Sequence, residues 1–174
     1  MGIKATTNPG SYLCVSFLWG KKRREVLNYI VDRVRGKLKS WKQQSLSYGG
    51  KEILIKVIAS AVPTYLMACF KFPVQICNML NASTANFLWG QKEDEKKIHW
   101  KSWMKLTMAK SLGGLGFKDV KIFNKALLAK QCWRLLNEPD ALWAKVMKGI
   151  YFHDRSIFKA RKGGRASWAW SVNR

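Results

Sequence analysis

The sequence predicts a mainly α-helical fold, on three observations. Apolar residues recur every three or four positions in several long segments, as in helices that bury one side. Proline and glycine residues fall between these segments, where helices begin or end. Hydrophobic residues make up 48% of the 174 residues and include nine tryptophans, which is enough to bury a core. A disordered basic tail is thereby excluded.

The clearest helix is expected over residues 21–46, where the apolar positions recur at spacings of three and four. These positions are Val26, Leu27, Ile30, Val31, Val34, Leu38 and Trp41. Ahead of this helix, the turn Asn8-Pro9-Gly10 precedes an apolar run over residues 12–19. That run predicts a short strand.

The next helix is expected over residues 51–61, after an interruption at residues 47–50. It is apolar on most sides, which is typical of a central core helix. Its apolar residues are Ile53, Leu54, Ile55, Val57 and Ile58. Pro63 must kink or end it, because proline lacks the amide proton that a helix interior needs. Residues 64–70 are expected to continue the helix after the kink.

The following helix is expected to begin at Pro73 and to end near residue 89. Its inward residues are predicted to be Ile76, Met79, Leu80, Phe87 and Leu88. A polar loop over residues 90–97, a short aromatic segment over residues 98–106 and a glycine loop over residues 110–117 follow.

Two further helices are expected near the C-terminal end. Asp119 is a plausible N-cap for a helix that ends near residue 136. Its apolar stripe is predicted to contain Phe123, Leu127, Trp133 and Leu136. Pro139 marks the entry to the last helix, over residues 140–148, with Leu142, Trp143 and Val146. The rest of the chain is aromatic and basic without clear periodicity.

The charge of the chain points to a polyanionic partner. There are 32 Lys and Arg residues against 10 Asp and Glu, a formal net charge of +22. The excess is +9 in residues 1–60, +4 in residues 61–110 and +9 in residues 111–174, so it is not confined to one arm. A folded surface this positive repels itself unless an anion screens it. Nucleic acid is the first candidate and an anionic membrane surface the second.

The residue types that carry most enzyme chemistry are scarce. The acidic cluster Glu93-Asp94-Glu95 lies between lysines and is read as a solvated turn rather than a metal site. His99 and His153 have no neighbouring nucleophile, and the four cysteines lack the spacing of zinc ligands. The glycine loop lacks the Lys-Ser/Thr of a phosphate-binding loop and is read as a turn. We therefore predict no catalytic residue, no metal site and no cofactor.

Basic residues interleaved with aromatic residues remain, and they predict contacts with phosphates and unpaired bases. The first helix is expected to lie along phosphates through Lys21, Lys22, Arg23, Arg24, Arg35, Lys39 and Lys42. A second basic face is expected from Lys118, Lys121, Lys125 and Lys130. The alternative interpretation of such residues is a solvated surface or a localisation signal.

Several ordered motifs, read together, resemble one family. They are Asn8-Pro9-Gly10-Ser11-Tyr12-Leu13, Trp41-Lys42, Leu46-Ser47, Gly50-Lys51-Glu52, Leu54-Ile55-Lys56, Ala61-Val62-Pro63-Thr64-Tyr65, Phe87-Leu88-Trp89-Gly90, His99-Trp100, Gly113-Gly114-Leu115-Gly116-Phe117, the run from Asn124 to Gln131 and Trp133-Arg134. The order is similar to the region downstream of the polymerase palm in plant LINE-type (non-LTR) retrotransposon reverse transcriptases. The family usually has Tyr-Leu-Gly-x-Pro where this chain has Cys14 and Ser16.

The resemblance implies a helical thumb-like segment over residues 1–90 and a linker-like segment with a basic aromatic tail over residues 91–174. It implies a non-catalytic role in binding RNA or an RNA–DNA template–primer, because the palm motif with its catalytic aspartates is not found here. An upstream palm is the implied protein partner, and no small-molecule substrate is implied.

Two alternatives stay open beside this interpretation. The chain could be a protein-interaction module that docks on the palm and does not bind nucleic acid, or it could bind anionic membranes peripherally. The stretch over residues 57–70 carries no charge, but Pro63 and its short length favour a buried helix over a membrane span. The widely spaced cysteines and the polar first ten residues predict an intracellular protein, nuclear or cytoplasmic and not secreted.

Overall fold

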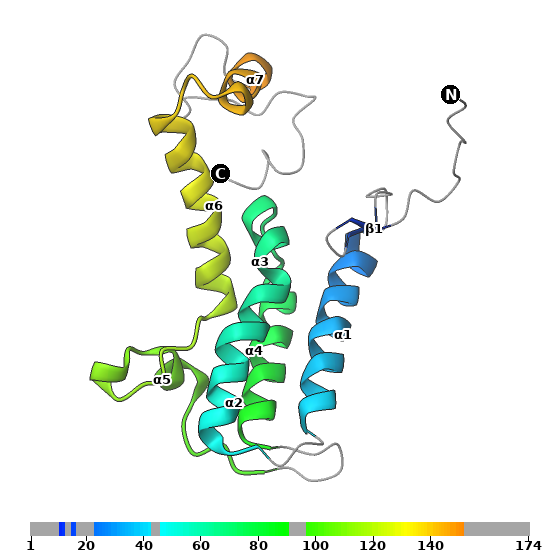
Figure 1. Ribbon diagram of the computed structural model, residues 1–174, viewed down its shortest axis with the longest axis vertical. Coiled ribbons are helices and arrows are strands. Elements are labelled where there is room, and N and C mark those ends of the chain that lie inside the picture. The colour runs from blue at the N-terminus through cyan, green and yellow to red at the C-terminus, as the bar shows by residue number, and fades with distance from the viewer. Residues whose placement is uncertain (1–10, 13–14, 17–22, 43–45, 91–96, 152–174) are drawn as a thin grey trace. The chain divides into compact units, whose positions relative to one another are not determined.

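A computed structural model of the chain describes residues 11–12, 15–16, 23–42, 46–90 and 97–151 (Figure 1). Over these ranges the fold is mainly α-helical, which confirms the predicted class. The helical elements are α1 (Arg23–Lys42), α2 (Tyr48–Leu54), the π-helical segment η1 (Ile55–Ala59), α3 (Ser60–Cys69), α4 (Val74–Leu88), α5 (Trp103–Thr107), the 3-10 turn η2 (Lys110–Leu112), α6 (Val120–Asn137) and α7 (Leu142–Tyr151).

Two short strands precede α1. Strands β1 (Ser11–Tyr12) and β2 (Val15–Ser16) pair antiparallel, with Ser11 opposite Ser16 and Tyr12 opposite Val15. They fall partly within the run predicted as a strand. The predicted turn before them, Cys14 and residues 17–19 lie outside the described residues.

The chain forms two compact units. The first comprises Met1–Tyr65 and Pro73–Val120, and the second comprises Leu66–Phe72 and Lys121–Arg174. Each unit therefore combines two separate stretches of the chain, and α3 contributes residues to both. The organisation into segments 1–90 and 91–174 stays a prediction.

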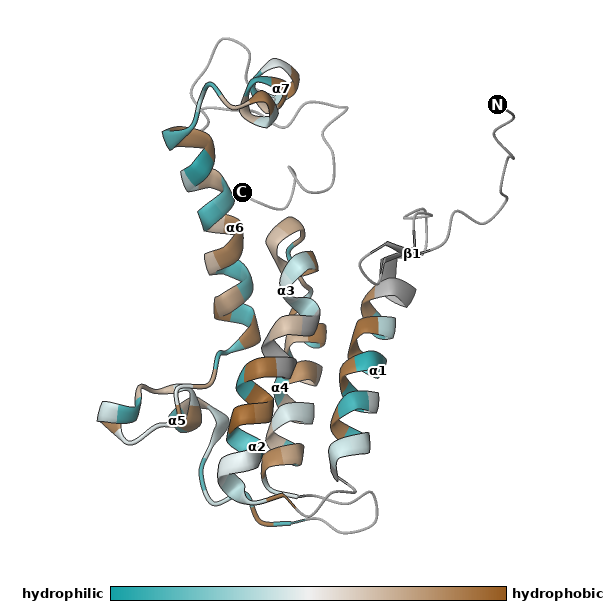
Figure 2. Ribbon diagram, in the orientation of Figure 1, coloured by the Kyte–Doolittle hydropathy of each residue, from teal (hydrophilic) through white to brown (hydrophobic). Residues whose placement is uncertain are grey.

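In the first unit, α1 packs against α4, and α2 and η1 pack against α4 as well. Five residues of the predicted α1 stripe are buried, and Trp41 is half-buried. The buried residues are Leu27, Ile30, Val31, Val34 and Leu38. In Figure 2 the hydrophobic side of α1 faces α4. Each buried aliphatic side chain contributes about 1.5–3 kcal/mol, so this contact is a main source of the unit's stability.

Helix α2 begins earlier than predicted. The Ser47 hydroxyl accepts a hydrogen bond from the Gly50 amide at 3.2 Å, which caps the first turn. Residues 48–50 therefore belong to the helix, so the predicted interruption is confirmed at the extended Ser47 and is wrong for the three residues after it. The prediction that this is a central core helix is also wrong, because Ile53 and Val57 are 63% and 60% exposed while only Ile55 of the predicted apolar residues is described as buried. The apolar pattern covers several sides of this helix, but its neighbours cover only part of it.

The helix continues through Pro63, which is buried inside α3. A proline ring clashes with the carbonyl four residues earlier, which here belongs to Ala59, the last residue of η1. A π-helical turn opens the backbone locally, so the widened segment η1 accommodates the proline. The prediction that the helix continues to about residue 70 is confirmed, since α3 ends at Cys69.

Helix α4 agrees with the prediction. Pro73 is its N-cap, and Ile76, Leu80, Phe87 and Leu88 are buried, with Met79 half-buried. Gly90 follows with a positive φ of 67°, a conformation that glycine adopts without steric cost, and it ends the helix at the start of the polar loop.

In the second unit, Asn124 of α6 ties the helix to residues 66–72. Its Oδ1 accepts from the Phe72 amide at 2.8 Å, and its Nδ2 donates to the carbonyls of Met67 (2.7 Å) and Phe70 (2.8 Å). Asn124 is only 2% exposed. Because these backbone groups lie past the end of α3 or in its last turn, the amide supplies partners that the helix itself does not.

The predicted stripe of α6 is wrong in part. Phe123 and Leu127 are half-buried, but Trp133 is 65% exposed and Leu136 is also exposed. The buried side of α6 instead carries Asn124, Leu128 and Leu135. In α7, Leu142 and Val146 are exposed, Trp143 is half-buried, and the small residue Ala144 is buried. Both helices carry apolar residues on more than one side, so periodicity alone could not select the covered one.

Candidate nucleic-acid interface

The structure places the predicted basic residues of the first helix along α1. Arg23 and Arg24 are in its first turn and Lys42 is its last residue, but their side chains lie outside the described part, as do Lys21 and Lys22 altogether. Arg35 and Lys39 are described, and both are exposed.

The helical register gathers most of these residues on one side of α1. At about 100° per residue, positions 24, 35, 39 and 42 fall within about 60° of one another. We call Arg24, Arg35, Lys39 and Lys42 the α1 flank. Asp32 borders it, and Arg33 and Lys37 lie about 160° away on the other side of the helix. Position 23 falls on the buried side of the register rather than on the flank.

Arg35 is held in place at the contact between α1 and α4. Its Nε donates to the Ser83 hydroxyl of α4 at 3.2 Å, and that hydroxyl donates to the Met79 carbonyl at 2.7 Å. The guanidinium has five N–H donors, so this bond orients the group and uses only one of them.

The second predicted basic set is divided between the two units. Lys118 belongs to the first unit, whereas Lys121, Lys125 and Lys130 are exposed residues of α6 in the second. Lys121 and Lys125 lie one turn apart, and Lys130 lies about 160° around the helix from them. A second basic face therefore stays a prediction, and the register supports the pair Lys121 and Lys125.

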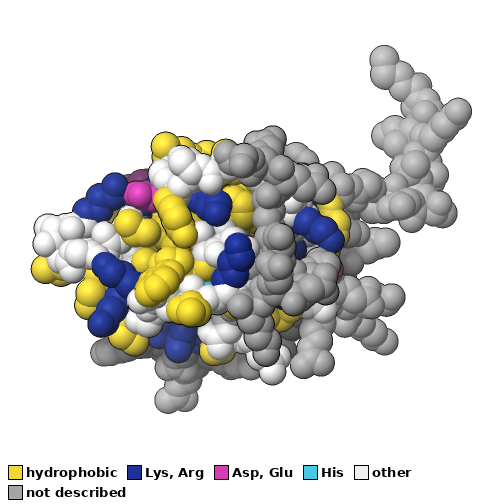
Figure 3. Space-filling model, turned by 90° about the horizontal axis from the view of Figure 1, so that it is seen from below, with side chains coloured by type: hydrophobic (Ala, Val, Ile, Leu, Met, Phe, Trp, Pro, Cys, Tyr) yellow, Lys and Arg dark blue, Asp and Glu magenta, His cyan; other side chains and the backbone are white. Residues whose placement is uncertain are grey.

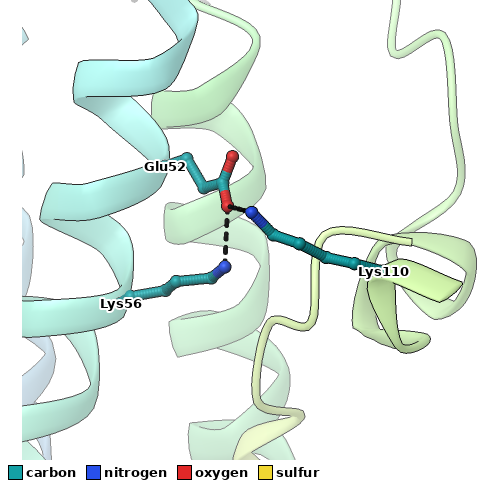
Figure 4. A network of polar contacts seen from close by, with 3 residues as sticks. All are labelled: Glu52, Lys56 and Lys110. Atoms are coloured by element: carbon teal, nitrogen blue, oxygen red, sulfur yellow. Dashed lines mark hydrogen bonds and ion pairs between the residues drawn. The ribbon is translucent and has the colours of Figure 1, made fainter. Parts of the chain in front are cut away.

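A basic cluster that the sequence did not predict surrounds Glu52 in α2 (Figure 4). Its Oε1 accepts from Lys56 Nζ at 2.7 Å and pairs with Lys110 Nζ of η2 at 2.9 Å. The hydrogen bond from Lys56 and then that from Lys110 lower the pKa of Glu52, against a smaller opposing effect of burial. The ion pair between Lys110 and Glu52 joins η2 to α2. Because the cluster contains two lysines and one glutamate, it carries one net positive charge.

We expect Glu52→Gln to destabilise the chain by no more than about 1 kcal/mol near neutral pH, because the ion pairs are partly exposed. A carboxylate with a lowered pKa stabilises the fold above its unfolded pKa, and that stability is lost as the pH falls through the folded pKa. Urea unfolding should therefore separate variant and wild type most clearly at about pH 7, and the difference should shrink as the pH falls below the unfolded pKa of a glutamate. The control is Glu138→Gln, which alters the longer, more exposed pair with Arg134. A difference of the same size at every pH would contradict a contribution from the ionised carboxylate.

The glycine loop is a structural turn, as predicted. The Leu106 carbonyl accepts from the amides of Leu115 (3.0 Å) and Phe117 (3.3 Å). A Cβ on Gly114 would lie 2.1 Å from the Met108 carbonyl oxygen, so only glycine fits at this close approach. Phe117 is buried and stacks on Trp103, with ring centroids 5.7 Å apart.

Comparison with known proteins shows that the chain is similar to plant proteins. It is 39% identical over 111 residues to the "Uncharacterized mitochondrial protein AtMg00310" of Arabidopsis thaliana, which is 63% of this chain and 72% of that protein. The chain belongs to the family of this mitochondrial protein. No family model matches the chain, and no solved structure matches it.

The chain is also similar to part of a longer plant protein. The chain is 34% identical over 128 residues (74% of its length) to the "Putative ribonuclease H protein At1g65750" of Arabidopsis thaliana. It spans only 21% of that relative. Both relatives are consistent with a region of a plant retroelement polyprotein.

In this family member, many motif residues build the fold. Phe87 and Leu88 are buried, and the Trp89 ring stacks on His99 with centroids 6.1 Å apart. Glu52 and Asn124 make the polar contacts described above. These motif residues therefore have structural roles, and the α1 flank, of which Arg35 and Lys39 are described as exposed, lies mostly outside the motifs.

Several described residues of types that often serve in catalysis have structural surroundings. Among them, no three His, Cys, Asp or Glu side chains are grouped so as to hold a metal ion. Asp119 accepts from Asn81 Nδ2 at 3.0 Å, and Asn81 Oδ1 accepts from the Val120 amide at the start of α6. Burial raises the pKa of the Cys69 and Cys132 thiols, which makes thiolates there scarce. The cluster Glu93-Asp94-Glu95 and His153 lie outside the described residues.

No helix within the described ranges is both long and apolar enough to cross a membrane.

Proposed function

We propose that this chain is a non-catalytic part of a LINE-type retrotransposon reverse transcriptase polyprotein, from the region downstream of the palm, that binds the RNA–DNA template–primer. The observation that carries the proposal is the α1 flank. It places basic residues on one side of a long helix, and Arg35 is oriented there by α4.

The dimensions of the flank suit a nucleic-acid backbone. Positions 24 to 42 span about 27 Å of helix axis. One strand of a duplex carries a phosphate about every 3.4 Å, so roughly eight phosphates lie along that length. Contacts of this kind neutralise the backbone without reading its sequence, so binding should tolerate any template.

A filter-binding titration with an RNA–DNA hybrid at two salt concentrations tests the proposal. With four phosphate contacts, the affinity should fall roughly a hundredfold between about 50 mM and about 200 mM salt. Affinity that does not change with salt would contradict backbone binding. A polymerase assay on the chain alone should stay at background, and incorporation above background would contradict the non-catalytic role.

A second function, docking on the palm as an interaction module, is favoured by exposed apolar side chains of α6 and α7. Trp133, Leu142 and Ile150 are among them. Gel filtration separates the two functions. A pure chain that aggregates, and that an upstream palm fragment returns to a defined complex, would favour docking over nucleic-acid binding.

A further inference from the structure

We propose that the segment over residues 97–105 is a stacking platform for an unpaired nucleobase, with the Trp100 ring as its surface. This inference rests on the proposed function and adds single-stranded nucleic acid to the duplex that the α1 flank would bind. The partner class is a polynucleotide with accessible bases.

The Trp100 ring is available for contact. Trp100 is 77% exposed, although tryptophan is usually among the more buried residues. The preceding residue, His99, stacks on Trp89 at the end of α4 with an interplanar angle of 26°. The backbone just before Trp100 is therefore attached to α4.

The segment is also attached on its other side. Trp103 begins α5 and stacks on the buried Phe117, and Leu106 of α5 is buried. Lys101 Nζ donates to the Gly113 carbonyl at 3.2 Å. Trp100 thus lies between two anchored rings, which lowers the entropy that would be lost when a base stacks on it.

The sequence on both sides of the ring is basic, which suits contacts with phosphates. Lys97, Lys101 and Lys105 are exposed, and no Asp or Glu occurs between residues 97 and 118. Figure 3 shows one face of the molecule, on which hydrophobic side chains lie beside basic and acidic side chains. The acidic residues 93–95 precede the segment in sequence and lie outside the described residues.

An exposed aromatic ring among lysines fits single-stranded nucleic acid better than an apolar protein surface. Bases stack on aromatic side chains regardless of sequence, while the cations contact the backbone. A protein or lipid partner would use the neighbouring exposed residues Ile98 and Met104 as much as the ring. Those partners make a different prediction for Trp100→Leu, which keeps apolar area but removes the aromatic face.

The experiment measures binding of the full chain to a single-stranded oligonucleotide and to an abasic strand of the same length. Trp100→Ala should weaken binding to the base-bearing strand roughly tenfold or more and leave the abasic strand unchanged. Trp100→Phe should stay close to wild type, whereas Trp100→Leu should behave like Trp100→Ala. Trp133→Ala, at another exposed tryptophan, is the matched control and should leave both affinities unchanged. Circular dichroism checks that each variant is folded.

Each other outcome has a defined meaning. If Trp100→Ala weakens both strands equally, or if Trp100→Leu binds like wild type, the stacking platform is overturned. If wild type binds both strands with a steep salt dependence and Trp100→Ala does not change this, only the platform fails and the proposed function stands. If wild type binds neither these strands nor the hybrid at any salt concentration, the proposed function fails as well.

Discussion

The double variant Arg35→Gln/Lys39→Gln should bind an RNA–DNA hybrid roughly fiftyfold more weakly than wild type at about 0.1 M salt. Each phosphate contact releases close to one counterion, so each contributes about 0.9 units to the slope of log affinity against log salt. Two lost contacts therefore lower the slope by about 2, and most of the difference should disappear near 1 M salt. Fluorescence anisotropy with a labelled hybrid measures both quantities.

The matched control is Arg33→Gln/Lys37→Gln. It removes the same two charges from exposed positions of the same helix, but on the opposite side. The net charge, and with it the long-range attraction, changes equally in both variants. The control should lose less than about threefold in affinity, because long-range attraction alone is screened at this salt. Equal losses in the two variants would show that the charge matters but the α1 flank does not.

Asn124→Ala should destabilise the second unit by about 3 kcal/mol. The substitution removes three hydrogen bonds and leaves the Phe72 amide and the carbonyls of Met67 and Phe70 without this partner. Each buried group that loses its partner costs about 1–3 kcal/mol, and partial access of water offsets some of the total. Urea unfolding followed by circular dichroism measures the change.

Asn124→Asp tests the two hydrogen bonds that the amide nitrogen donates separately from the one that the amide oxygen accepts. A carboxylate can still accept from the Phe72 amide, but it cannot donate to either carbonyl, so this variant should be at least as unstable as Asn124→Ala near neutral pH. Asn137→Ala, at an exposed position of the same helix, is the control and should change stability by less than about 1 kcal/mol. A loss at Asn124 no larger than that of the control would contradict a role for its amide in joining α6 to residues 66–72.

The parts of the fold that could be predicted depend on local pattern. The α1 stripe repeats over about four turns, and a pattern of that length specifies both the helix and its buried side. The helix from residue 48 onwards was predicted to start too late, because Gly49 and Gly50 are poor helix formers. The Ser47 cap decides the start instead, and the capping serine was in the sequence to be found.

The parts that could not be predicted depend on distant partners. Asn124 contacts groups 52 to 57 residues away, and nothing in its own helix indicates them. The exposure of Trp133 depends on which side of α6 is covered, which is a tertiary property. Trp133 and Leu136 were therefore wrongly predicted to face the core.

The candidate interface likewise has a part that local sequence pattern predicts and a part that depends on distant partners. The basic residues of α1 could be named because helical spacing converts sequence into a surface. Lys56 and Lys110 meet at Glu52 from segments 54 residues apart, so sequence reasoning missed them. The Trp100 platform left a usable signal in the sequence, an aromatic pair among lysines spaced four apart. Only the structure shows that the His99 ring stacks on Trp89 while the Trp100 ring is exposed.

The claim that the phosphate backbone lies along the α1 flank is tested most directly by lysine footprinting. Acylation rates of individual lysines are measured by mass spectrometry with and without a saturating RNA–DNA hybrid. Lys39 and Lys42 should be protected, while Lys37 on the opposite side of α1 should react at its free rate. Equal protection of the three lysines, or protection of Lys37 alone, would contradict the assignment of the flank.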